Sequence, residues 1–184
     1  AGQAQVPDLR RLPVQHDGRA MPFDTLARET VWTLTGSRTW KGQEPAATVT
    51  AWMLDPEACA HEPIVEVGSR EFVRVLGLPE GTTHDSFVRL VRNPRVLQLV
   101  GAAQRGEGPR SLAREAERLD RRLRALNELL DGEFLRVFPV PDDPGAAWGA
   151  PEAITAEGLK RLAEGPRLEG WPSGSRIERE VFFN

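Results

Sequence analysis

Three histidines and one cysteine are the side chains of this chain that could support metal, haem or nucleophilic chemistry. Cys59 and His61 are separated by one residue, whereas covalent haem attachment needs Cys-x-x-Cys-His and a zinc site needs further Cys or His ligands. His16 lies at an expected turn and His84 at an expected helix start. We interpret all three histidines as exposed polar residues, and we expect no metal and no cofactor in this domain.

No catalytic constellation is recognisable in the sequence. Glycine-rich phosphate loops and the Gly-x-Ser-x-Gly motif are absent. The carboxylate pairs Glu115/Glu117 and Asp142/Asp143 lie on polar stretches that offer no apolar pocket to shift a pKa. The sequence therefore does not support an enzymatic activity, although residues far apart in the chain can converge in a fold.

The composition indicates one globular domain, from residue 1 to residue 184, with a net charge of −3. Because no global basic field exists, we expect no nucleic-acid partner. The single cysteine excludes an internal disulfide, and no apolar run reaches the roughly 18 residues of a membrane span. The stretch 1–8 lacks the apolar core of a signal peptide, and we expect it to be a flexible start.

The elements that must position any site begin with the stretch Leu12–Gly36. Asp17-Gly18 predicts a tight hairpin turn, since glycine tolerates a positive φ. Pro22 ends the hairpin, and Asp24 is expected to cap a helix that stops at Gly36. We also expect Arg19 and Asp24 to form a charge-assisted bond between hairpin and helix.

The longest expected helix, Ser111–Asp131, carries apolar residues at alternating spacings of four and three. Our interpretation is an amphipathic helix packed in the core, and the alternative is a seam that binds a partner helix. The seam residues are Leu112, Ala116, Leu119, Leu123, Leu126 and Leu130.

Shorter elements complete a fold class that is mainly α with a minor β part (α+β), built around this long helix. We expect the strand segments 64–67 and 134–138 to join the opening hairpin in the β part. The other expected helices are 46–54, 70–76, one capped by Thr83 or Asp85 that ends near Arg92, one that starts at Asn93-Pro94, and 155–163.

The opening stretch resembles bacterial cytochrome c biogenesis proteins of the CcsA/ResC type, in the soluble extracytoplasmic region of their larger versions. The matching residues are Pro13, Val14, Gln15, Gly18, Arg19, Pro22, Asp24, Thr25, Leu26, Ala27 and Glu29. Weaker matches follow in 52–67 and around 135–148. Among these residues we take Gln15, Gly18, Arg19, Pro22, Asp24 and Thr25 as the family-motif site.

The end of the chain supports the same resemblance. Ser175 and Glu178 form a capping box that starts a helix, which then stops at two adjacent phenylalanines, Phe182 and Phe183. In the resembling family a similar segment leads into a membrane span. We therefore expect a domain excised from a multi-span membrane protein, with 175–184 as the start of that helix.

The resemblance implies the function of the parent protein, which is to deliver haem and help attach it to apocytochrome c. It implies a place in the bacterial membrane, with this domain on the periplasmic side in a docking or scaffold role, and haem ligands that lie at the spans. The implied partners are apocytochrome c or a ResB-like membrane protein. Two other classes stay open: a free-standing interaction domain that uses the Leu112–Leu130 seam, and a small-ligand-binding domain.

Tryptophans are numerous for a chain without tyrosine. Three of them lie in loops rich in glycine and proline, where an aromatic side chain can mark a partner or membrane interface. This candidate partner interface consists of Trp40, Trp148 and Trp171.

Overall fold

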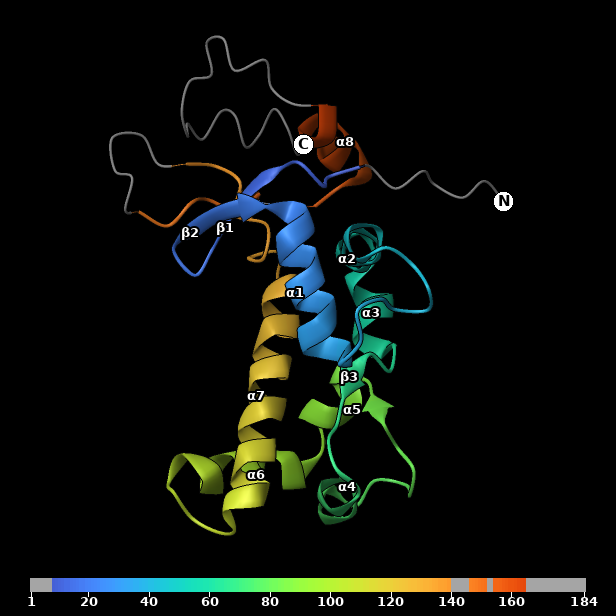
Figure 1. Cartoon of the computed structure of the whole chain (residues 1–184), viewed down its shortest axis with the longest axis vertical. Helices are drawn as coiled ribbons and strands as arrows, with labels where there is room; N and C mark the ends of the chain where they lie inside the picture. The colour runs from blue at the N-terminus through green and yellow to red at the C-terminus, as the bar shows by residue number, and fades with distance from the viewer. Residues whose placement is uncertain (1–7, 140–145, 152–153, 165–184) are drawn as a thin grey trace.

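The computed structural model describes residues 8–139, 146–151 and 154–164. As the sequence predicted, the fold is mainly helical, with two small antiparallel sheets of two strands each. Figure 1 shows α7 (Arg110–Leu130) running along an elongated molecule, with α1 (Phe23–Thr35) beside it. The other elements are β1 (Pro13–His16), β2 (Arg19–Pro22), α2 (Pro45–Leu54), α3 (Pro56–His61), β3 (Val65–Glu66), α4 (Arg70–Leu76), β4 (His84–Asp85), α5 (Phe87–Val91), α6 (Pro94–Gln104) and α8 (Ala156–Glu164).

The apolar seam of α7 is buried inside this chain. Ala116, Leu119 and Leu126 are at most 1% exposed, and the other leucines of the seam pack partly buried against the same core. Helices α1, α2, α3, α5 and α6 all contact α7. The seam is thus desolvated by the chain's own elements, which confirms the core interpretation. The alternative of a partner helix bound along Leu112–Leu130 is wrong.

The N-terminus of α1 differs from the expected cap. The helix begins at Phe23, its N-cap is Pro22, and no side chain caps it, so Asp24 is not the N-cap. Instead, backbone N–H groups at the start of the helix donate to carbonyls of the incoming chain, Phe23 to Leu12 at 2.8 Å and Asp24 to Arg10 at 3.1 Å. These bonds satisfy donors that a helix start would otherwise leave unpaired. The C-terminus agrees with the prediction, since Gly36 closes it at φ +67°.

The β part is smaller than predicted and is not joined into one sheet. β3 pairs with β4, a strand that the sequence analysis did not predict, rather than with the hairpin of β1 and β2. The segment 134–138 forms no strand; Phe138 makes an isolated bridge to Gly149. Its side chains do not alternate between core and solvent, since Phe134, Leu135, Val137 and Phe138 are all buried.

Local capping signals placed most other helices correctly. Ser69 caps α4 with Gly77 at its end, and Asn93 caps α6 through its side chain. The cap of α5 is Ser86, not Thr83 or Asp85, because Asp85 is occupied in β4. Helix α3, which Asp55 caps through a bond from the Ala58 N–H, was not predicted.

Arg122 of α7 ties three elements together at the C-terminal end of α1. Its Nε donates to the Thr33 carbonyl at 2.9 Å and its Nη1 to the Glu66 carbonyl at 3.0 Å, while Nη2 pairs with the Glu66 carboxylate. Burial lowers the pKa of Arg122 from its ordinary value, and the charge of Glu66 opposes that shift. The guanidinium thus joins α1, β3 and α7 by several donors at once.

Some predictions lie outside the described residues, namely the flexible start over 1–7, the helix over 175–184, and Trp171. Among the residues that are described, none of the helices combines the length and apolarity that crossing a membrane requires.

Candidate functional site

The hairpin of the family motif reverses in a two-residue turn. Asp17 and Gly18 have φ values of +48° and +73°, so both central residues occupy the left-handed region. Positive φ at both positions defines the tight turn whose twist matches that of two antiparallel strands. This requirement explains why a glycine occupies position 18. The register then places His16 opposite Arg19 and Gln15 opposite Ala20.

Gln15 fastens this hairpin to two distant segments. Its backbone N–H donates to the Arg136 carbonyl at 2.9 Å. Its side-chain Nε2 donates to the Ala146 carbonyl at 3.2 Å, and its Oε1 accepts the Trp148 N–H at 2.7 Å. Gln15 is only 6% exposed, and its side chain bonds both a donor and an acceptor of the loop, as a neighbouring strand would. We call Gln15 with its partners Ala146 and Trp148 the Gln15 clasp.

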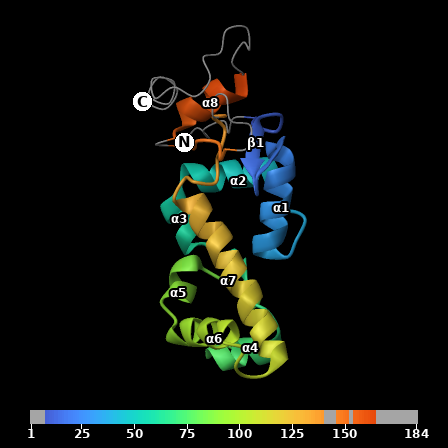
Figure 2. The same ribbon diagram turned by 90° about the vertical axis from the view of Figure 1, so that its left-hand side faces the viewer.

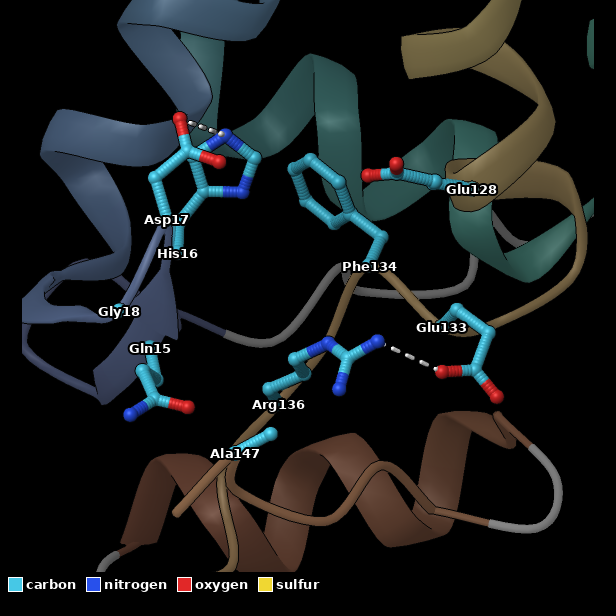
Figure 3. Close-up of a pocket in the computed structure, with 9 residues that line it drawn as sticks. All are labelled: Gln15, His16, Asp17, Gly18, Glu128, Glu133, Phe134, Arg136 and Ala147. Atoms are coloured by element: carbon cyan, nitrogen blue, oxygen red, sulfur yellow. Dashed lines mark hydrogen bonds and ion pairs between the residues drawn. The ribbon is translucent and has the colours of Figure 1, made fainter. Parts of the chain in front are cut away.

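Gln15 also lines a pocket of about 390 Å³, the hairpin pocket (Figure 3). Gln15 and the turn residues lie on one side, and the C-terminal end of α7 with the segment that follows it lies on the other. The lining residues are Gln15, His16, Asp17, Gly18, Glu128, Glu133, Phe134, Arg136 and Ala147. In Figure 3 the Phe134 ring lies between His16 and Glu128, with Arg136 and Glu133 on the side toward Ala147.

The charges of the hairpin pocket are mostly negative. Three carboxylates line it, and Arg136 partly offsets them through a 3.0 Å pair with Glu133. His16 Nε2 lies 3.7 Å from the Asp17 carboxylate. With His16 neutral the lining carries two net negative charges, which favours a ligand segment of positive charge.

These residues do not fit haem. The porphyrin is a flat apolar ring with acidic substituents, whereas the hairpin pocket has three carboxylates, the His16 imidazole beside one of them, and the Phe134 ring, which is only 4% exposed. Among the described residues, no group of three His, Cys, Asp or Glu side chains is placed to hold a metal ion.

Of the six family-motif residues, Gln15 and Gly18 line the pocket, and Pro22 connects β2 to α1. Arg19 and Thr25 are exposed, and Asp24 pairs with Arg28 at 2.8 Å. The predicted Arg19–Asp24 bond is therefore wrong. Arg19 adjoins the turn, and Asp24 is the second residue of α1, beyond the far end of β2, so about five residues of chain, on the order of 15 Å, separate them.

Two of the loop tryptophans are described, and both are partly buried. Trp40 donates its indole N–H to the Glu62 carboxylate at 2.9 Å, and its ring lies 5.3 Å from that of His84. Burial would raise the pKa of Glu62, but hydrogen bonds from Lys41 and Trp40 outweigh it and lower that pKa. Trp40 thus holds its loop to the fold, while the three-tryptophan interface stays a prediction.

The other two histidines also make local contacts. His84 Nε2 lies 2.9 Å from the Thr35 carbonyl, so this residue is a partly buried connection between β4 and α1 rather than a free loop side chain. His61 is exposed at the end of α3, with Nδ1 2.9 Å from the Glu57 carbonyl. Only His16 of the three lines the hairpin pocket.

Sequence reasoning missed the acidic wall of the pocket. Glu128, Glu133 and Arg136 come from the end of α7 and the next segment, more than a hundred residues after the hairpin. The sequence did contain one signal for this pocket, because the family resemblance covers the hairpin on one side of it and residues 135–148 near the other side. That shared match could have suggested that the two segments meet.

No family model matches the chain. A search of curated proteins finds similarity to Protein NrfI of Wolinella succinogenes, with 24% identity over 139 residues. The match covers 71% of this chain but only 15% of that protein. It supports a link between this chain and cytochrome c biogenesis, in agreement with the resemblance of the hairpin stretch.

Proposed function

We propose that this chain is an extracytoplasmic domain of a cytochrome c biogenesis protein of the CcsA/ResC type, and that it docks a polypeptide at the hairpin pocket. The parent protein would lie in a bacterial membrane, with this domain on the periplasmic side. Haem would be handled by the parent system, because the pocket residues do not fit it. Apocytochrome c is the proposed polypeptide, and a ResB-like membrane protein is the other partner to test.

The observation that carries the proposal is the position of the motif residues. Gln15 and Gly18 belong to the stretch with the family resemblance, and both line the pocket whose opposite wall is acidic. An open, negatively charged hollow that includes one phenylalanine in its lining suits a flexible, positively charged segment of polypeptide. The similarity to Protein NrfI supports the biogenesis context.

Reversal of one pocket charge tests the docking role. Glu128 is exposed, lines the pocket and has no ion pair among the described residues, so Glu128→Lys should leave the fold intact. In the full-length protein we expect this variant to lower the yield of holocytochrome c, measured by haem staining. In the isolated chain we expect weaker binding of apocytochrome c, by about tenfold for a loss near 1.4 kcal/mol.

Glu29→Lys is the matched control, since Glu29 is an exposed carboxylate of α1 that does not line the pocket. Both variants change the net charge equally, so a general electrostatic effect would weaken both. If Glu128→Lys binds apocytochrome c and matures cytochrome c as well as Glu29→Lys does, the pocket is not the docking site. Loss of binding to a ResB-like protein alone would assign the pocket to that partner.

A further inference from the structure

The end of the molecule opposite the hairpin has a different surface character. Of the large hydrophobic side chains in the described part of the chain, three are exposed: Trp32 at 56%, Val91 at 37% and Leu97 at 67%. Val91 ends α5 and Leu97 lies in the first half of α6, so two of the three belong to one short stretch of chain. Leu97 thus leaves most of its apolar surface in water, and burial of that surface against a partner would be favourable.

Helix α6 is almost free of charge. Between Pro94 and Gln104 its only charged residue is Arg95, and it contains no carboxylate. It packs on α7, and its buried side chains are Val96 and Ala103. Leu97 does not line the hairpin pocket, and at 67% exposure it lies on the surface of the helix.

The sequence on both sides of this helix is rich in arginine. Residues 70–124 contain twelve arginines, no lysine and seven carboxylates, a net charge of +5, whereas the rest of the chain has a net charge of −8. Arg92 stands just before α6 and Arg110 soon after it; both are exposed, and neither forms an ion pair with another residue that the structure describes. Arginine suits phosphate because its planar guanidinium donates two parallel hydrogen bonds.

Helix α6 is placed where it could lie against a flat surface. Figures 1 and 2 show α6 lying across the end of the elongated molecule, beside α4, while α7 leads away from that end. A helix in this position can lie parallel to a plane, with its exposed leucine toward the plane and arginines at both ends. An exposed apolar side chain with arginines nearby can bind at the interface of an anionic bilayer through both contacts.

We propose that the α6 end, formed by Val91, Leu97, Arg92 and Arg110, docks on an anionic phospholipid surface. Leu97 enters the boundary between headgroups and acyl chains, and the arginines bind lipid phosphates. A protruding leucine favours a deformable headgroup layer over a protein partner, which would need a matching cavity. This inference does not rest on the proposed docking of apocytochrome c.

The test uses the full 184-residue chain and sedimentation with large vesicles of phosphatidylcholine alone or mixed equally with phosphatidylglycerol. We expect binding to the mixed vesicles only, weakened by salt. Leu97→Gln and the pair Arg92→Gln with Arg110→Gln should each reduce the partition coefficient by at least about tenfold, since one surface arginine near anionic lipid contributes about a factor of five. All three residues are exposed, so folding should be unaffected.

The matched controls are Trp32→Gln, at the other exposed hydrophobic residue, and the pair Arg11→Gln with Arg38→Gln, which removes the same charge elsewhere. Both controls should bind as the unchanged chain does. An environment-sensitive dye on L97C should shift to the blue with mixed vesicles, and a dye on W32C should not. The proposal is overturned by absence of binding, by equal losses in the controls, or by binding that needs the arginines but not Leu97. The last result would indicate a purely electrostatic surface, such as one for an acidic protein.

Discussion

Replacing Gln15 by leucine removes the side chain that joins the hairpin to the Trp148 loop. Gln15→Leu has a similar volume but leaves the Ala146 carbonyl and the Trp148 N–H without their partner. Each lost bond costs about 1 kcal/mol where water can reach the freed group and up to about 3 kcal/mol where it cannot. Because both bonds are only partly buried, we expect a total loss of about 2 kcal/mol in the free energy of unfolding.

Urea denaturation measures this loss as a lower midpoint with an unchanged slope. Hydrogen exchange supplies the local readout, since the Trp148 amide should lose its protection in Gln15→Leu. The control is Gln104→Leu, an exposed position of α6, which should stay within about 0.5 kcal/mol of the unchanged chain.

Gln15→Glu refines the same prediction. The introduced carboxylate still accepts the Trp148 N–H but faces the Ala146 carbonyl without a proton to donate. Protonation restores a donor, so this variant should gain stability relative to the unchanged chain as the pH falls through the raised pKa of the new group. A Gln15→Leu midpoint equal to that of Gln104→Leu, together with a protected Trp148 amide, would refute the clasp.

Three further predictions concern the core. Gly36→Ala should destabilise the fold by about 1–2 kcal/mol in urea denaturation, because a Cβ at φ +67° would lie 2.8 Å from the Glu66 carboxylate. Arg122→Met should cost about 2–4 kcal/mol, and Arg122→Lys should recover little of it, since an ammonium cannot reproduce the planar fork that bonds Thr33 and Glu66. Burial raises the pKa of the Cys59 thiol from 9.0 to about 12. Unfolding therefore releases a proton above pH 9, so stability should fall by at most about 1.4 kcal/mol per pH unit between these values, and Cys59→Ala should remove that slope.

Local signals in the sequence located the helices, but contacts between distant segments decided the rest of the fold. Ser69 and Asn93 are side-chain caps whose bonds span only two or three residues, so the sequence alone could place α4 and α6. The start of α1 is satisfied instead by carbonyls of Arg10 and Leu12, which no capping pattern reveals. The pairing of β3 with β4 likewise depends on a long connection that local periodicity does not describe.

The candidate site was predictable to the same partial degree. The family match identified Gln15 and Gly18, and the turn chemistry explained the glycine. Glu128 lies in the opposite wall because of the way the end of α7 packs. The helical pattern alone indicates only that its carboxylate faces solvent. The contacts of Arg122 were equally unpredictable. The helical pattern places this residue at the edge of the seam, but no sequence signal indicates that its guanidinium bonds Thr33 and Glu66.

The continuity of α7 fixes a separation between the two ends of the domain. Its 21 residues form one helix without interruption, about 30 Å long. Glu128, on the wall of the hairpin pocket, belongs to its last turns, and Arg110 is its first residue. A molecule held in the pocket would consequently stand at a set height above whatever lies against α6. The helix sets this spacing, and inserting or deleting four residues, about one turn, would change that height by about 6 Å while rotating the seam beyond the change by only about 40°.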